Sequence, residues 1–137
     1  MQAIDQDDIL YRLLTDAWED CTPFWEAVWE IAFPCEEAEA DAHYREAIPE
    51  AQRLMRLLLL SGLITVYHGP DYHSGLGAHG EFEVSPKRAA AIIDNPMSWR
   101  SPSDTEKVGE YFCFYVTEAG KQLWHMGRKA FRLPENI

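Results

Sequence analysis

The sequence predicts a single α+β domain over residues 1–137, with a helical N-terminal half, a small antiparallel sheet and a C-terminal helix. Three observations predict this class. Apolar residues recur at helical spacing through much of the first half. Two runs rich in β-branched and aromatic residues, at 63–67 and 111–116, are typical of strands. A chain of 137 residues can also bury one core without disulfide or metal staples.

The first helix is expected to begin near the acidic N-terminus. Asp5 or Asp7 can cap it, because a carboxylate accepts hydrogen bonds from the free N–H groups of a first turn. Apolar residues then recur at helical spacing from Ile9 to Cys21 and leave the acidic residues on the opposite face.

A second helix is expected to begin at Thr22-Pro23 and to end at Pro34. Threonine followed by proline is typical of an N-cap and a first helical position. Phenylalanine, tryptophan and aliphatic residues cover most of this helix's circumference. The pattern therefore predicts a helix buried on nearly every side.

The third helical segment is expected to begin at Pro49. The acidic, alanine-rich stretch before it, 36–46, fits either a solvated helix or a charged loop. An amphipathic stripe then runs through Leu58, and Gly62 supplies the glycine that often follows a helix. The strand at 63–67 comes directly afterwards.

The segment 68–110 is expected to be a long connection between the two strands. Its first part is rich in glycine, and 81–84 alternates like a short strand. Ser85-Pro86 indicates the start of a helix, whereas the prolines and glycine within 94–110 indicate a second irregular connection.

Two motifs resemble winged helix-turn-helix proteins of the MarR-like type. Leu-Leu-Leu-Leu-Ser-Gly-Leu-Ile at 57–64 resembles the end of a recognition helix that turns into the first wing strand. Tyr-Val-Thr-Glu-Ala-Gly-Lys at 115–121 resembles the closing strand and the N-cap of the next helix. The resemblance implies a winged-helix-like fold, with 68–110 as an inserted, extended wing and Pro49 to Ser61 as the recognition helix. Its DNA-binding residues would be Gln52, Arg53 and Arg56.

Charge is distributed unevenly along the chain. The formal net charge is −11, and residues 1–50 hold 14 acidic residues against only Arg12 and Arg45. The rest of the chain has a net charge of +1. Such a field repels phosphate backbones and attracts basic partners, although an acidic surface can also serve solubility alone.

We therefore expect a non-catalytic protein that binds a basic protein partner, as an inhibitor or immunity-type protein that neutralises a toxin. The alternative expectation is a winged-helix transcriptional regulator that binds DNA as a homodimer. Trp99 lies between two proline turns and could be an exposed interface anchor. The residues expected to bind the partner are Asp16, Glu19, Asp20, Glu26, Glu30, Glu36, Glu37, Glu39, Asp41 and Trp99.

Enzyme, metal and cofactor functions are not expected. Glycines at 75–80 fit a G-x-G-x-x-G pattern but run into a strand-like segment instead of a helix N-terminus. Histidines and acids within 68–81 include possible metal ligands, without diagnostic spacing. The three cysteines form no metal or redox motif, and no export signal or membrane span is visible. A cytoplasmic location is expected.

Overall fold

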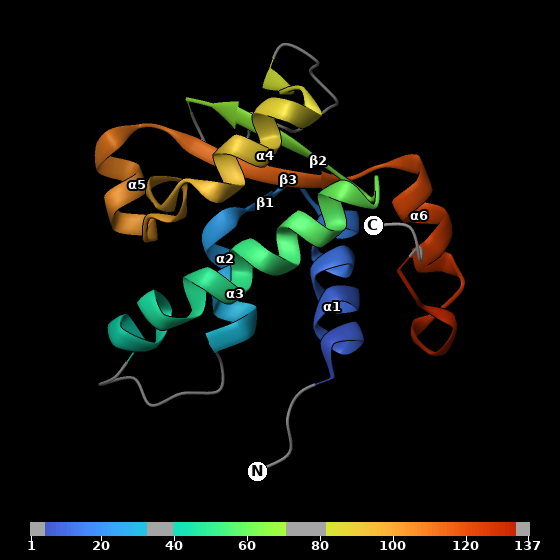
Figure 1. Cartoon of the computed structure of the whole chain (residues 1–137). Helices are drawn as coiled ribbons and strands as arrows, with labels where there is room; N and C mark the ends of the chain where they lie inside the picture. The colour runs from blue at the N-terminus through green and yellow to red at the C-terminus, as the bar shows by residue number, and fades with distance from the viewer. Residues whose placement is uncertain (1–4, 33–39, 71–81, 134–137) are drawn as a thin grey trace.

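A computed structural model of the chain describes residues 5–32, 40–70 and 82–133. Within these ranges the protein is an α+β structure, mostly helical, with one small antiparallel sheet, which confirms the predicted class (Figure 1). No helix in the described ranges is long and apolar enough to cross a membrane. The elements are α1 (Gln6–Glu19), β1 (Thr22–Pro23), α2 (Phe24–Ala32), α3 (Ala40–Leu60), β2 (Ile64–Gly69), α4 (Pro86–Asp94), η4 (Pro96–Trp99), α5 (Pro102–Val108), β3 (Tyr111–Val116), α6 (Glu118–His125) and η5 (Arg128–Ala130).

The sheet has the strand order β1-β3-β2, and both pairs are antiparallel. β3 is therefore central, with β2 paired along its whole length from Ile64 opposite Val116 to Gly69 opposite Tyr111. The aromatic, β-branched run at 111–116 thus forms a strand as predicted.

Thr22 and Pro23 form an edge strand and do not begin the second helix, so that prediction was wrong. Pro23 has no N–H to donate, and proline is tolerated at a sheet edge. The Thr22 hydroxyl donates hydrogen bonds to the carbonyl oxygens of Asp16 at 2.9 Å and Asp20 at 3.1 Å. These bonds hold the turn between α1 and β1, and α2 begins one residue after the strand ends.

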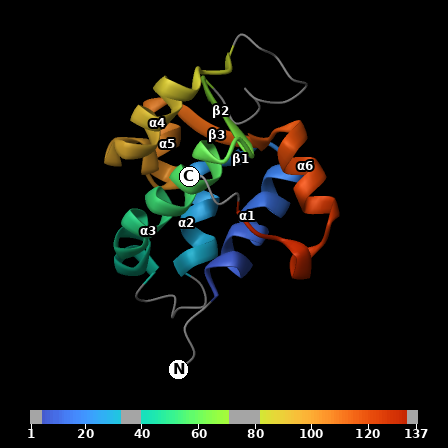
Figure 2. The ribbon, with the colours of Figure 1, turned by 45° about the vertical axis from the view of Figure 1, so that its right-hand side comes forward.

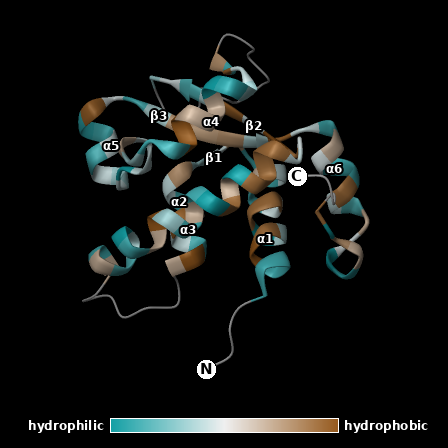
Figure 3. Cartoon of the chain, in the orientation of Figure 1, coloured by the Kyte–Doolittle hydropathy of each residue, from teal (hydrophilic) through white to brown (hydrophobic). Residues whose placement is uncertain are grey.

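The core lies between the sheet and the helices α1, α2 and α3. α1 lies between α2 and α6, and it contacts both of them (Figure 2). Hydrophobic residues, drawn in brown in Figure 3, are concentrated along α1 and in the last turns of α3. The expectation that α2 is buried on nearly every side was wrong, because only Phe24, Ala27 and Val28 of this helix are buried and Glu26 is exposed.

α3 begins at Ala40, nine residues before the predicted start, and Pro49 lies inside it. A proline at this position removes the hydrogen bond to the carbonyl of Arg45, one turn earlier. Contacts of the first half compensate for this loss, because Tyr44 and Ala47 are buried and the Tyr44 hydroxyl donates to carbonyl oxygens of the 96–104 segment. The predicted glycine at the C-terminal end is confirmed, since Gly62 has φ +73°.

Much of the long connection is helical. The predicted helix at Ser85-Pro86 is confirmed as α4, but within the described part of 81–84 only Glu83 forms a bridge, opposite Tyr67. The expectation of an irregular connection over 94–110 was wrong. Asn95-Pro96 and Ser101-Pro102 each act as an N-cap followed by a first-position proline, and they begin η4 and α5.

α6 packs on α1 at the other side of the molecule. Thr117 caps it as predicted, and its hydroxyl accepts a hydrogen bond from the Gly120 N–H at 3.1 Å. The Tyr11 hydroxyl donates to the carbonyl of Trp124, and the Trp124 indole N–H donates to the Thr15 hydroxyl at 2.9 Å.

Candidate functional site

Five of the predicted partner-binding residues lie on α1, at its C-cap and on α2, and the short strand β1 connects the two helices. Asp16, Glu19 and Asp20 belong to the last turn and C-cap of α1, and Glu26 and Glu30 lie one turn apart on α2. The Asp20 carboxylate accepts a hydrogen bond from the Cys21 N–H at 2.8 Å, which helps to hold the turn between the helices. We call these five residues the acidic cluster.

Mutual repulsion and burial perturb this cluster. Asp16 is half-buried, and burial, the charge of Glu30 and a hydrogen bond with Glu30 raise the pKa of Asp16 to about 7. Burial and the charges of Asp20 and Glu30 also raise the pKa of Glu26. Both shifts mean that the surroundings disfavour the ionised carboxylates of Asp16 and Glu26. A nearby positive charge would therefore stabilise the ionised form of the cluster.

No base among the described residues compensates these charges. None of the ion pairs formed within 5–32, 40–70 and 82–133 includes a member of the acidic cluster. Seven acidic residues elsewhere in the described chain pair with bases, whereas Asp41, Glu46, Glu83, Asp104 and Glu106 do not. The paired acids are Asp5, Asp7, Asp8, Glu50, Asp94, Glu110 and Glu118.

The other predicted partner-binding residues do not extend the cluster. Glu36, Glu37 and Glu39 lie outside the described residues. Asp41, in the first turn of α3, is exposed and lines the separate pocket described below.

Trp99 is not an exposed anchor, and that prediction was wrong. Only 1% of its surface is exposed, and its indole N–H donates to the carbonyl of Ile93 at 2.9 Å. Its ring packs against Phe24 with 4.6 Å between centroids. The proline turns on either side of Trp99 begin helical segments, and these place the ring inside the core.

The residues proposed for DNA recognition are engaged within the fold. The Gln52 amide donates to the carbonyl of Ile93 at 3.1 Å. Arg53 forms an ion pair with Glu50, and Arg56 forms one with Asp94 of α4. Both arginine charges therefore have an acidic neighbour on the molecule itself.

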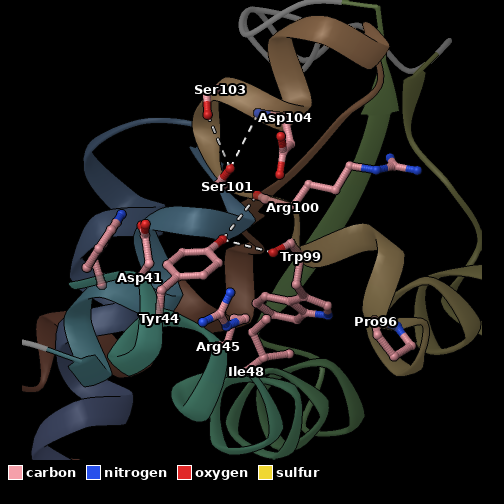
Figure 4. Close-up of a pocket in the computed structure, with 11 residues that line it drawn as sticks. Asp41, Tyr44, Arg45, Ile48, Pro96, Trp99, Arg100, Ser101, Ser103 and Asp104 are labelled. Atoms are coloured by element: carbon pink, nitrogen blue, oxygen red, sulfur yellow. Dashed lines mark hydrogen bonds between the residues drawn. The ribbon is translucent and has the colours of Figure 1, made fainter. Parts of the chain in front are cut away.

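A pocket of about 430 Å³ opens between α2, the first half of α3 and the 96–104 segment (Figure 4). Its wall includes Trp29 and Tyr44, whose rings are 5.1 Å apart between centroids. The Tyr44 hydroxyl donates to the carbonyl oxygens of Trp99 at 2.9 Å and Arg100 at 3.1 Å. We call this the aromatic pocket. It is lined by Trp29, Asp41, Tyr44, Arg45, Ile48, Pro96, Trp99, Arg100, Ser101, Ser103 and Asp104.

Sequence reasoning missed the aromatic pocket because its lining comes from three segments far apart in the chain. One available signal was the pattern of aromatic and charged residues around Tyr44, within a stretch that could have been either helix or loop. A helix over 40–48 would have placed Asp41, Tyr44 and Ile48 on one face. Their shared partner in the 96–104 segment could not be read from spacing.

Two thiols lie beneath the acidic cluster. Cys21 and Cys113 are both free and buried, and they form a small apolar group with Tyr67. A hydrogen bond between the two thiols, together with burial, raises the pKa of Cys113. A thiol that resists ionisation is a poor nucleophile, so this pair supports packing and not catalysis.

The described residues also contain no group of three or more histidine, cysteine or carboxylate side chains arranged to hold a metal ion. Of the possible loop ligands, His68 is described, and it stacks on Phe112 with 4.4 Å between ring centroids. No protein-family model, curated protein or solved structure matches the chain.

Proposed function

We propose that this protein is a non-catalytic binding protein that neutralises a basic protein partner through the acidic cluster, in the manner of an inhibitor or immunity protein directed against a toxin. The observation that supports it is the uncompensated charge. The cluster places five carboxylates on adjoining elements, and none of them forms an ion pair with a described base. Elsewhere the described acids are commonly paired.

Electrostatics explains why a basic partner suits this surface. Burial, together with the nearby Glu30, raises the pKa of Asp16 and disfavours its ionised state in the free protein. A partner's lysine or arginine would offset that penalty and favour the ionised carboxylate. The negative potential would also accelerate the encounter with a basic partner. Electrostatic steering raises association rates more than it raises affinity.

We also propose a winged-helix-like fold and a cytoplasmic location. The order of helix, short strand, two helices, strand, long connection, strand and helix supports a winged-helix-like architecture in which residues 68–110 extend the wing. A cytoplasmic location agrees with the buried, unbridged thiols of Cys21 and Cys113. DNA binding stays the alternative function, but it is disfavoured by the acids paired with Arg53 and Arg56.

A capture experiment with charge-matched variants tests the function. The test variant replaces the central acids of the cluster (Asp16→Asn, Glu26→Gln, Glu30→Gln). The control replaces three acids outside it (Glu46→Gln, Glu106→Gln, Glu118→Gln). Both proteins are immobilised beside the parent, incubated with nuclease-treated cell extract and analysed by mass spectrometry.

The expected result is a basic protein captured by the parent and the control but not by the cluster variant. Equal capture by all three proteins would refute the role of the cluster. Retention of nucleic acid in an extract without nuclease, lost in an Arg53→Glu, Arg56→Glu variant, would instead favour the DNA-binding alternative.

A further inference from the structure

The aromatic pocket contains charged side chains that the fold leaves without ion-pair partners. Asp41 and Arg45 lie one turn apart on α3, and Asp104 lies in the first turn of α5. None of these three side chains belongs to an ion pair within the described ranges. Figure 4 shows the Asp41 carboxylate to one side of the Tyr44 hydroxyl and the Asp104 carboxylate above it.

The remaining polar groups of the pocket do not add positive charge to its interior. The Arg100 guanidinium donates to Glu110 at 3.4 Å, and in Figure 4 its side chain extends away from Tyr44. The carbonyl oxygens of Trp99 and Arg100 lie at the pocket wall, where they accept hydrogen bonds from Tyr44. Among the described residues that line the pocket, two carboxylates and two carbonyl oxygens therefore contribute negative potential. The exposed Arg45 is the one guanidinium there that forms no ion pair.

The aromatic wall adds a second attraction for cations. The rings of Trp29 and Tyr44 meet at an interplanar angle of 57°, and both line the pocket. The face of an aromatic ring attracts a cation through its quadrupole. A planar guanidinium suits this arrangement better than a compact ammonium, because it can stack on a ring while it forms two hydrogen bonds with a carboxylate.

We infer that the aromatic pocket binds an arginine side chain of the same basic partner that the acidic cluster attracts. The inference rests on the proposed function and adds the chemistry of the anchor. The two sites adjoin in the chain, because Glu30 of the acidic cluster directly follows Trp29 of the pocket on α2. Trp99 then contributes to the pocket that receives a partner side chain, and it is not itself the inserted anchor.

A peptide pair tests the pocket without the partner. One probe is an N-acetylated, C-amidated tripeptide with a central arginine, and the other carries citrulline, which has nearly the same shape without the charge. Each is titrated to millimolar concentration into isotopically labelled protein, and amide and indole NMR shifts are recorded. The arginine peptide should shift resonances of Trp29, Tyr44 and residues 101–104, whereas the citrulline peptide should not.

Three variants test whether negative charge in the pocket attracts the arginine peptide. Asp41→Asn and Asp104→Asn should each weaken binding of the arginine peptide by about two- to fivefold, because each removes one opposite charge at an exposed position. Arg45→Gln should strengthen it by about threefold, because it removes a like charge from an exposed position. The amide spectrum of each variant also reports whether it folds as the parent does.

The outcomes separate this inference from the proposed function. Equal binding of the citrulline peptide, no shifts at millimolar concentration, or weaker binding by Arg45→Gln would each overturn the arginine pocket. The cluster variant should keep its affinity for the arginine peptide while it fails to capture the partner. If capture depends on the cluster but the peptide does not bind, only the pocket inference is refuted.

Discussion

The replacement of Asp16 by asparagine should stabilise the protein at neutral pH. Asparagine mimics the protonated carboxyl, and its amide can still donate to Glu30. Because the pKa of Asp16 is raised in the folded state to about 7, the folded protein binds more protons than the unfolded chain between about pH 4 and pH 7. The contribution of Asp16 to stability therefore falls as pH rises through this window, and it is constant above it.

The magnitude follows from the size of the pKa change and the exposure of the group. One pKa unit corresponds to about 1.4 kcal/mol, which would give about 4 kcal/mol for a fully desolvated carboxyl with this change. Asp16 is only half-buried, so screening by solvent reduces the effect, and we expect a gain of about 1–2 kcal/mol in the free energy of unfolding.

Urea unfolding of the parent and Asp16→Asn at about pH 5 and about pH 8 measures this effect. The stabilisation by asparagine should be larger at the higher pH. Glu106→Gln, on the exposed surface of α5, is the control and should show no such trend. A difference between parent and Asp16→Asn that does not change with pH, or destabilisation by asparagine at about pH 8, would refute the electrostatic description of the cluster.

Three further changes test the fold around the sites. Gly120→Ala should destabilise the protein by about 1–3 kcal/mol in urea unfolding, because a Cβ there would overlap the carbonyl oxygen of Leu63 and a methyl group of Val116; unchanged stability would mean that α6 packs elsewhere. Trp99→Phe should lower the free energy of unfolding by about 2 kcal/mol, since it removes the indole hydrogen bond to the Ile93 carbonyl, which keeps only the Gln52 amide as a donor, and leaves unfilled space in the core, and a melting temperature equal to the parent's would contradict the burial of this ring. Thr117→Ala should cost about 1 kcal/mol through loss of the cap on α6, with Thr117→Ser close to the parent; equal stability of the alanine and serine variants would argue against the cap.

Local signals in the sequence were sufficient for the elements whose ends are set by neighbouring residues. Asp5 caps α1, Ser85 caps α4 and Thr117 caps α6, as their positions before helical patterns predict. The strand at 111–116 was also recognisable, because its side chains are aromatic or β-branched almost throughout.

The elements that sequence reasoning missed depend on contacts between distant segments. Thr22-Pro23 has the chemistry of a helix start, but pairing with Phe114 and Cys113 makes it an edge strand. Pro49 has the chemistry of a helix start too, yet contacts between Tyr44 and the 96–104 segment support a helix on both sides of it. In each case a long-range partner decided between two local possibilities.

The candidate site was predictable only where local spacing determines it. The spacing of Glu26 and Glu30 places them on one helix face, and the short turn after α1 brings Asp16 near them. The burial of Trp99 could not be predicted, because the prolines near it suggest a loop. Its ring is buried by packing on Phe24 of α2, and its indole N–H binds the carbonyl of Ile93 in α4. The aromatic pocket likewise exists only after α2, α3 and α5 have packed.

The association rate of the captured basic partner reports directly on attraction by the acidic cluster. Stopped-flow or surface-based kinetics would compare the parent, the cluster variant and the control variant at low and high ionic strength. Association with the parent should slow several-fold as the salt concentration rises. The cluster variant should associate several-fold more slowly than the parent at low salt, whereas the control should stay close to the parent. An association rate that is the same in all three proteins and insensitive to salt would contradict the claim that the acidic cluster attracts the partner.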